Sequence, residues 1–489
     1  MQGLNELLTG ATGSLAHLAP ELILIAGILL VLFAGLFGSR NHLLFNILTM
    51  ASAMASFLYT IGGGLDTNEV LFEMLHRDGF GEFLMLLIDV SVVLSCLMSI
   101  RQRALRNTSE YYALILSVAA GSHFLVMSTN LIMVFVSLEF VSITSYVLAG
   151  YAFTRKGSEG SLKYFIFGSI ASAVMLYGFT MLYGLTGTMD FSHEIFFNRL
   201  IETSSPILLV GGLMALAGFL FKMAAVPMHL WAPDIYEAAP MPVIAYLSVA
   251  PKVAALGILM KFILAMNAFG QNAFDWQLVV AAVAIITITF GNLSALWQDN
   301  PKRMMAYSSI AHTGFLLVGI TAFTAEGAQL MLFYAAVYLL MNFAVFVYLM
   351  YFEKHGFFSM TSFAGQGKRL PWAAVGITIA LVALTGIPPT AGFTAKLFIF
   401  SSLWESYQET HKSLLFWLLV VGLLNTVISL FFYLKIPYYA FIRSGEPATV
   451  QKNAAFENFL GFILVVLVVV IFFVPGLLMG LINRINFVL

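Results

Sequence analysis

The long apolar stretches of this chain constrain its fold more than any other feature. Windows of about 20 mostly apolar residues, the length of a helix that crosses the hydrocarbon core of a bilayer, occur fourteen times. Only 10% of the residues are charged, against roughly 25% in a soluble domain. We therefore predict an all-α polytopic membrane protein with about fourteen transmembrane helices. The expected spans lie near residues 20–38, 43–63, 80–100, 111–128, 130–150, 162–186, 206–232, 241–268, 276–297, 302–323, 328–352, 371–403, 413–441 and 455–483.

The distribution of lysine and arginine predicts the orientation of these spans. Most of the basic residues in loops follow odd-numbered spans, as Arg155 and Lys302 do, and the loops after even-numbered spans hold only Arg77, Arg199 and Lys412. Because positive charge marks the cytoplasmic side, both termini are predicted to lie on the other side, the periplasm of a bacterium. No basic region precedes the first apolar stretch, so we expect no cleaved signal peptide.

Two of the expected spans are interrupted by proline. The seventh contains Pro227 and Pro233, the twelfth contains Pro388–Pro389, and each also contains a lysine. They are five spans apart, so the second copy would be inverted in the membrane, as in ion-coupled transporters. We therefore predict two inverted five-helix repeats, helices 4–8 and 9–13, with broken helices 7 and 12. The corresponding division is 1–110 for helices 1–3, 111–270 for the first repeat, 271–445 for the second repeat and 446–489 for helix 14.

Four ionisable residues lie deep inside expected spans and are candidate proton carriers. They are Glu139, Lys222, Lys252 and Lys396. A charge at the bilayer centre costs about 2.5–3.5 kcal/mol on insertion scales, so each needs a partner or a function. A lysine that loses its hydration can release a proton, whereas arginine stays protonated, and the six basic residues assigned to the interior of the spans are all lysines. The alternative is a set of buried salt bridges that only fix the packing, a role that apolar residues fill equally well.

Five further residues in the spans are less distinctive. Lys163 opens the sixth span, and its position leaves a relay role and a helix-end role equally open. His229 and His312 lie in spans near the buried lysines, and for them relay and packing roles are both open. Lys261 and Lys435 are interpreted as lysines near helix ends whose amines reach towards water.

The composition excludes several classes of site. A single cysteine, Cys96, excludes a disulfide framework, an iron–sulfur cluster and a cysteine-based zinc site. The nine histidines show no paired metal-ligand spacing, so we expect no metal site. No dinucleotide or phosphate-loop motif occurs, so we expect no bound cofactor. The net charge of −1 gives no indication of nucleic-acid binding.

Four long segments resemble one known family. They are GSEGSLKYFIFGSIASAVMLYGFTMLYGLTG (157–187), FKMAAVPMHLWAPDIYEAAPMPVIAYLSVAPK (221–252), GNLSALWQDNPKRMMAYSSIAHTGFLLVG (291–319) and LTGIPPTAGFTAKLFIF (384–400). These segments are similar to the antiporter-like subunits of respiratory complex I, the NADH:quinone oxidoreductase, and most of all to the subunit N branch. The likeness covers nearly the whole chain. Lys396 stands where the subunit M branch has a glutamate.

The resemblance implies a role for each candidate residue. Glu139 and Lys222 match the charge-modulating pair of the family's fifth and seventh helices. Lys252 matches the central lysine of the eighth helix, and Lys396 matches the lysine of the twelfth helix beside the exit half-channel. Lys163 matches a lysine of the family's sixth helix. His229 and His312 match, less specifically, positions in the family's hydrated central axis.

The resemblance also implies partners and a location. The chain is expected to be a proton-translocating subunit in a bacterial inner membrane, next to other antiporter-like and small membrane subunits of complex I. NADH and quinone would be used by the whole complex, and this chain would bind no cofactor. Two alternatives stay open at this point. One is a cation/proton antiporter related to the multisubunit Na⁺/H⁺ antiporters, and the other is an assembly scaffold.

Overall fold

The computed structural model describes residues 15, 17–37, 41–62, 68–70, 74–101, 108–202, 206–267, 274–445 and 455–485. Nearly all regular structure in these residues is helical. The exception is a short antiparallel hairpin of β1 (Asn68–Val70) and β2 (Leu75–Arg77), in which Asn68 lies opposite Arg77. The predicted all-α fold is therefore confirmed. Most of residues 1–16 lie outside the described residues. The boundaries expected at 270/271 and 445/446 also lie in or beside stretches that the structure does not describe.

The number of spans agrees with the sequence. Thirteen segments of the described chain are long and apolar enough to cross a membrane, and each coincides with an expected span. The remaining expected span, the twelfth, is divided between α16 (Pro371–Thr385) and α17 (Ala391–Thr410). Together they give the predicted fourteen. The inverted relation between two five-helix repeats stays a prediction.

The described residues form two compact units that are not continuous in sequence. Unit 1 runs up to Met223 and resumes for Ala250–Trp276, with Ile485 at its end. Unit 2 consists of Ala224–Val249 and Gln277–Arg484. The chain therefore leaves unit 1 at the end of one helix, contributes 224–249 to unit 2, and returns.

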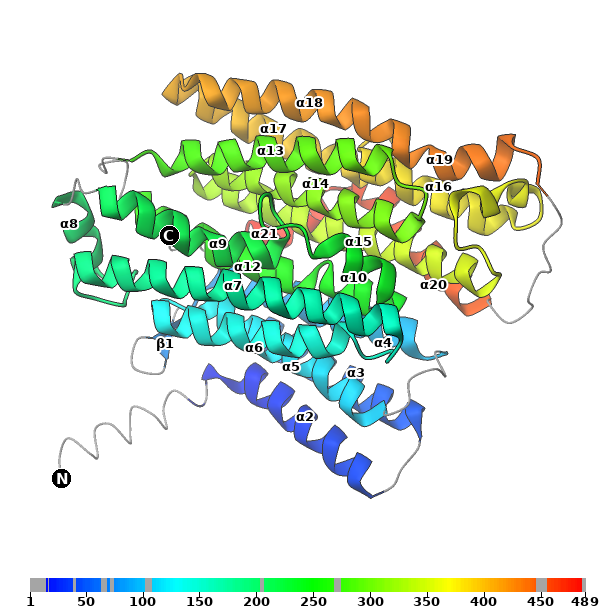
Figure 1. Ribbon diagram of the computed structural model, residues 1–489, viewed down its shortest axis with the longest axis horizontal. Helices are drawn as coiled ribbons and strands as arrows, with labels where there is room; N and C mark the ends of the chain where they lie inside the picture. Colours follow the sequence, from blue (N-terminus) through cyan, green and yellow to red (C-terminus); the bar gives the residue numbers. More distant parts are fainter. Residues whose placement is uncertain are drawn as a thin grey trace. The chain divides into compact units, whose positions relative to one another are not determined.

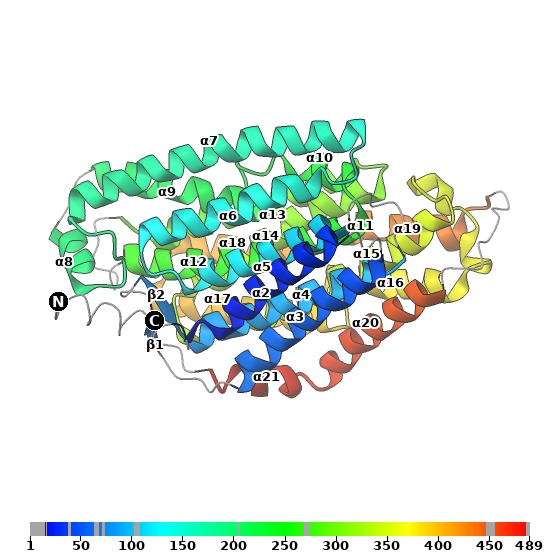
Figure 2. The same cartoon turned by 90° about the horizontal axis from the view of Figure 1, so that it is seen from below.

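Unit 1 is a bundle of long helices, drawn in blue to green (Figures 1 and 2). Its tightest helix pair is α7 with α9, where a Cβ at Gly178 would lie 2.5 Å from the backbone nitrogen of Ala215. Small residues allow such close contact between membrane helices, as the glycines and alanines of 168–184 suggest. The helices of unit 1 are α2 (Ala19–Leu36), α3 (His42–Gly62), α4 (Gly79–Ser99), α5 (Thr108–Met127), α6 (Leu131–Ala149), α7 (Arg155–Thr186), the short α8 (Glu194–Glu202), α9 (Pro206–Met223) and α12 (Ala250–Asn267).

Unit 2 is built around α15, which is buried along almost its whole length. Helices α16, α17 and α20 pack against it. The elements of unit 2 are α10 (Ala232–Ala238), α11 (Met241–Leu247), α13 (Trp276–Leu296, after its first residue), α14 (Pro301–Thr321), α15 (Ala325–Lys354), η2 (Met360–Phe363), η3 (Gln366–Lys368), α16, α17, α18 (Ser413–Tyr433), α19 (Lys435–Pro437), η4 (Tyr438–Ile442), α20 (Ala455–Phe473) and α21 (Gly476–Ile482).

The two proline-containing spans are broken as predicted. Helix α9 ends at Met223, Ala224 has a positive φ of 56°, and no regular helix follows until α10. Helix α16 ends at Thr385, because Gly386 adopts the left-handed conformation at φ 85° and prolines follow. Helix α17 then begins after Thr390. Both breaks leave backbone groups without helical partners at membrane depth, which is tolerated only inside protein or beside a hydrated cavity.

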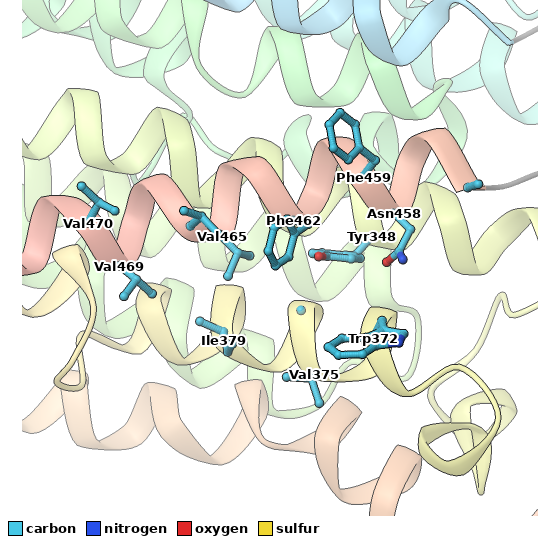
Figure 3. Close-up of a pocket in the computed structure, with 13 residues that line it drawn as sticks. Tyr348, Trp372, Val375, Ile379, Asn458, Phe459, Phe462, Val465, Val469 and Val470 are labelled. Atoms are coloured by element: carbon cyan, nitrogen blue, oxygen red, sulfur yellow. The ribbon is translucent and has the colours of Figure 1, made fainter.

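An apolar groove of about 580 Å³ lies on unit 2 between α15, α16 and α20. Figure 3 shows Trp372 on one of its sides and Phe462 and Val465 on another. Its lining contains no charged residue. Trp372 and Phe459 are largely exposed, as expected for side chains that face lipid. The groove is therefore distinct from the candidate proton carriers.

Candidate proton-transfer residues

Lys222 lies at the interrupted end of α9, in the last helical turn. Its side chain is buried, with the residue 1% exposed. The Nζ atom donates to Ser142 Oγ and Ser145 Oγ of α6, at 3.3 Å each, and lies 5.9 Å from the centre of the Tyr164 ring of α7. These partners are neutral, so the structure places the amine in a polar pocket that does not cancel its charge.

Glu139 supplies the nearest opposite charge that acts on Lys222. It lies one turn before Ser142 on α6. No carboxylate oxygen of the described residues comes within 4.0 Å of Lys222 Nζ, so the two are not in ion-pair contact. Glu139 Oε1 is buried without a hydrogen-bond partner among these residues. With an effective dielectric constant of about 20, the attraction of two unit charges is about 4 kcal/mol at 4 Å and about 2 kcal/mol at 8 Å. A small movement of α6 against α9 would therefore change the stability of the Lys222 charge.

Lys252 is the third residue of α12 and belongs to unit 1 with Lys222. It is 2% exposed. Every residue from Ala250 to Met260 in this helix is buried, so the ammonium group lies where bulk water does not reach. Pro251 precedes it in the first turn, a position where the missing N–H of proline costs no helical hydrogen bond.

Lys396 lies in the second turn of α17 and reaches back across the second helix break. Its Nζ donates to the carbonyl oxygen of Thr385, the last residue of α16, at 2.7 Å. The C-terminal end of a helix carries partial negative charge and favours a cation there. The ammonium also lies 4.4 Å from the centre of the Phe315 ring. Gly386 makes this approach possible, because a Cβ there would lie 2.8 Å from Lys396 Cδ.

His312 is the centre of a hydroxyl network in unit 2. Its Nδ1 is 2.8 Å from Tyr334 Oη and its Nε2 is 3.2 Å from Tyr433 Oη. Tyr433 in turn hydrogen-bonds to Ser308. The ring of Phe315 packs on His312 with centroids 5.9 Å apart, so Phe315 contacts both His312 and Lys396. Hydroxyl groups donate and accept, which is what proton transfer requires of a chain.

A second set of hydroxyls lies beside this network, one residue further along α14. Ser309 contacts Tyr338 at 2.8 Å and accepts a hydrogen bond from Tyr236 at 2.9 Å. Asn342 donates to Ser248, which precedes Lys252 by four residues in the chain. Unit 2 thus contains neighbouring sets of buried polar side chains around α14 and α15.

The two other candidates lie in different surroundings. His229 follows the first helix break, is 5% exposed, and packs edge-on against Phe290 at 4.5 Å. Its Nδ1 is buried without a hydrogen-bond partner among the described residues. Lys163 is on the exposed face of α7 and pairs with Glu159 at 3.0 Å. The structure therefore does not bring Lys163 into the buried group around Lys222.

At the cytoplasmic end predicted for α14, Arg303 forms ion pairs with two acids. Its guanidinium lies 3.1 Å from Asp234 and 3.1 Å from Glu237, both on α10. All three side chains are about one-third exposed. These partly exposed side chains contrast with Lys222, which is 1% exposed.

Comparison with known proteins places these residues in one family. The model of the NADH:quinone oxidoreductase/Mrp antiporter transmembrane family matches residues 128–429. The chain belongs to this family. The matched range contains every candidate named above, from Glu139 to Lys396. A relative named NADH-quinone oxidoreductase subunit N 2, from Chloroherpeton thalassium, is 37% identical over 91% of this chain and 88% of its own length.

Solved structures give the same fold at lower identity. A chain in the structure of respiratory complex I from Thermus thermophilus superposes with a TM-score of 0.79 at 24% identity, covering 94% of this chain and 98% of that one. A chain of the Mrp complex from Dietzia sp. superposes with a TM-score of 0.79 at 20% identity, covering 95% and 96%. The resemblance stated from the four sequence segments, including the subunit N branch, is confirmed. This family member is a multi-pass membrane protein.

Three buried ionisable residues of unit 1 were not predicted as candidates. Glu21, Asp89 and His123 are in contact in the interior of α2, α4 and α5. The sequence signal was present, because Asp89 lies in the middle of MLLIDVSVVL and His123 in AAGSHFLVM. A charged residue inside an apolar window indicates a partner or a function in these early spans, as it does in the later spans.

The interpretation of Lys261 is corrected in one respect. We expected its amine to reach water alone, but it forms an ion pair with Asp78 at 2.6 Å and donates to the carbonyl of Val126 at 2.9 Å. Lys435 instead donates to the carbonyls of Leu296 and Gln298. Among the described residues, no group of three or more His, Cys, Asp or Glu side chains is arranged as metal ligands. That the chain binds no metal or cofactor stays a prediction.

Proposed function

We propose that this chain is a proton-translocating membrane subunit of an NADH:quinone oxidoreductase. The observation that carries the proposal is Lys222, buried against two serines with its carboxylate partner beyond ion-pair distance, in a member of this family. A structural salt bridge would bring the two charges together, because separated buried charges are costly. A lysine that gains and loses its proton during a pumping cycle needs a carboxylate partner that is not in direct contact with it.

The residues suggest an order of proton movement. Approach of Glu139 to Lys222 would favour a charged lysine, and withdrawal would release its proton to Lys252 in the same unit. Lys396 would release the proton at the far end, beside the α16 terminus that holds its amine. The hydroxyl network around His312 would carry protons through unit 2. Lys163 and His229 remain candidate members of the proton relay.

The rest of the machinery would be supplied by partners. This chain would bind neither NADH nor quinone, and redox chemistry in other subunits would drive its charge movements. Its partners would be neighbouring antiporter-like and small membrane subunits of the same complex. It would lie in a bacterial inner membrane with both termini in the periplasm, as the loop charges predict.

Substitution of the buried lysines tests this function. We expect Lys222→Ala and Lys396→Ala membranes to pump far fewer protons per NADH oxidised than wild-type membranes with the same content of assembled complex. Lys435→Ala is the matched control, because this lysine donates only to backbone carbonyls and should leave pumping unchanged. Full pumping by both buried-lysine variants would refute the proposal.

A cation/proton antiporter is the second candidate, because the family model also covers Mrp antiporters and a chain of an Mrp complex shares this fold. It predicts that the chain reconstituted alone exchanges Na⁺ or K⁺ for protons. It also predicts that the chain purifies without NADH dehydrogenase subunits. An assembly scaffold would instead lose complex content on substitution while the assembled complex pumped normally.

A further inference from the structure

A histidine held between two carboxylates lies in unit 1, and the proposed function uses none of these three residues. His123 Nδ1 is 3.1 Å from Glu21 Oε1, and His123 Nε2 is 3.4 Å from Asp89 Oδ1. All three side chains are buried, with exposed fractions of 0–1%. Asp89 Oδ2 also accepts a hydrogen bond from Ser56 at 2.8 Å. The residues come from four helices, α2, α3, α4 and α5.

Helix α3 shows that this interior is polar along its length. Its buried residues include Asn46, Thr49, Ser56 and Thr60, spaced three to seven apart on one face. Its exposed face carries apolar side chains such as Leu43, Ile47 and Leu58. A membrane helix that turns its polar side inward lines a protein interior with hydrogen-bonding groups. At the other end of the same face, Asn46 donates to Tyr112, which contacts His42.

The charges of this group do not balance. Glu21 and Asp89 supply two acids and His123 one base, so a protonated imidazole between two ionised carboxylates leaves one negative charge. The neighbouring ion pairs, Arg77 with Glu82 and Lys261 with Asp78, are each neutral in themselves. A buried unpaired charge is expensive and is usually removed by binding a proton. The two carboxylates can therefore take up protons in addition to the one that a neutral imidazole holds.

Unpartnered oxygens and nitrogens at the group support the same reading. Glu21 Oε2 is buried and has no hydrogen-bond partner among the described residues. His123 Nε2 and Asp89 Oδ1 lie 3.4 Å apart without forming a hydrogen bond, so these two buried atoms also lack a hydrogen-bond partner among the described residues. Buried polar atoms in native proteins are nearly always paired, and exceptions indicate function. An added proton would give one of these atoms a partner.

The group leads from the middle of the bundle to one of its ends. Asp89 lies midway along the 21-residue α4, whereas Glu21 is in the first turn of α2 and Glu82 in the first turn of α4. Glu21 acts electrostatically on Glu82, and Glu82 is paired with Arg77 at 2.6 Å. This end of the bundle, closed by the β1–β2 hairpin, is the one predicted to face the periplasm. The other titratable side chains on the elements packed here are His42, Tyr59, His76, Cys96, Glu110, Tyr111, Tyr112, Glu139, Tyr146, Lys252 and Lys261.

We propose that Glu21, His123 and Asp89 form a second proton-binding site that exchanges protons with the outer end of α2–α5. With the ring neutral and protonated at Nδ1, a proton bound at the Asp89 carboxyl passes to His123 Nε2 as the Nδ1–H proton passes to Glu21. Glu21 then releases the proton past Glu82 and Arg77. A proton that enters at Glu21 reloads Asp89 by the reverse steps and restores the first tautomer, so the protons gained and lost balance. The inference rests on the proposed function only for the direction of net movement.

Isosteric variants of the two acids test the site in membranes with assembled complex. We expect Asp89→Asn and Glu21→Gln each to lower the protons pumped per electron at least twofold at unchanged complex content, because an amide does not exchange a proton. Asp89→Glu should restore most of the ratio. Glu457→Gln is the matched control, since Glu457 is equally buried but paired with Lys354. Wild-type ratios in both acid variants would overturn the proposal.

A spectroscopic measurement covers variants that assemble poorly. The full chain in lipid nanodiscs should show an infrared band of a buried protonated carboxyl group. Either isosteric variant should remove this band, and His123→Gln should shift its frequency. Absence of such a band from the wild-type chain would overturn the proposal.

Parallel measurements on Lys222→Ala separate this site from the proposed function. If Lys222→Ala pumps fully and Asp89→Asn does not, the lysine relay fails and the second site stands. If Lys222→Ala loses pumping while both acid variants keep it, the lysine relay stands and the second site fails.

Discussion

The ion pair of Asp78 and Lys261 gives a prediction whose size follows from the structure. Asp78 caps α4, accepting the Gly81 N–H at 2.6 Å, and its side chain is only 2% exposed. Burial alone would raise the pKa of this carboxyl, but the charge of Lys261 and the hydrogen bonds from His76, Lys261 and Gly81 lower the pKa from 3.8 to about 2. At about 1.4 kcal/mol per pKa unit, this difference corresponds to roughly 2.5 kcal/mol of stability.

The sign of the pH dependence follows from the lowered pKa. An acid with a lower pKa in the folded state stabilises the fold at pH values above its unfolded pKa, here 3.8. That contribution is lost progressively as the pH falls from about 4 to about 2. Asp78→Asn keeps an oxygen that caps the helix, so the variant removes the charge and little else. We expect it to be about 2–3 kcal/mol less stable at pH 7.

Thermal unfolding of the purified full chain in detergent measures the effect at pH 7 and again near pH 3. The difference between wild type and Asp78→Asn should shrink at the lower pH. Glu202→Gln is the control, because its pair with Arg199 is exposed at 61% and 68% and is worth about 0.5 kcal/mol or less. If Asp78→Asn costs no more than this control, or if its cost does not decrease on acidification, the reasoning is wrong.

Three further predictions concern the second unit and the exposed face of α7. Gly386→Ala should lower the melting temperature more than Gly356→Ala: both glycines have φ 85°, which costs alanine about 1–2 kcal/mol, but only at Gly386 does the new Cβ meet another side chain. Lys354→Ala should cost about 3 kcal/mol in thermal unfolding because it leaves Glu457, 1% exposed, without its partner, and Glu457→Gln should cost less. Lys163→Ala should change stability by at most about 0.5 kcal/mol, because its pair with Glu159 is exposed; a loss above 1 kcal/mol would contradict this.

The membrane spans could be predicted from sequence because the bilayer imposes one simple requirement. Each span must be long, apolar and helical, and thirteen of the fourteen expected windows contain such a helix, whereas the twelfth is divided between α16 and α17. The amphipathic α8 and the β1–β2 hairpin were not predicted, because they lie outside the apolar core, where no comparable requirement acts. The break in the seventh span was placed at Pro227, but the helix already ends at Met223, since Ala224 takes a left-handed conformation that no sequence rule required.

The candidate site was predicted unevenly for the same reason. Lys222 and Lys396 are evident in sequence because each is charged and lies beside a helix break. The contact between Glu21 and His123 joins residues 102 positions apart, and no local pattern connects them. Likewise, the amine of Lys261 meets Asp78 only because α12 packs on α4. A charge in a span can be recognised from the chain alone, whereas its partner is decided by which helices pack together.

Residues 224–249 belong to unit 2, whereas the residues on both sides of them belong to unit 1. This arrangement has a consequence for biosynthesis. Unit 1 needs Ala250–Trp276 to complete its bundle, and these residues leave the ribosome before almost all of unit 2. The segment carrying α10 and α11 is made still earlier, yet its helical partners α14 and α15 come later. That segment, which follows Lys222 directly, must therefore wait in the translocon or lipid until the second half of the chain is inserted. A chain divided after Trp276 would deprive its second fragment of α10 and α11, so the two fragments would have to recombine to form the complete interior of unit 2.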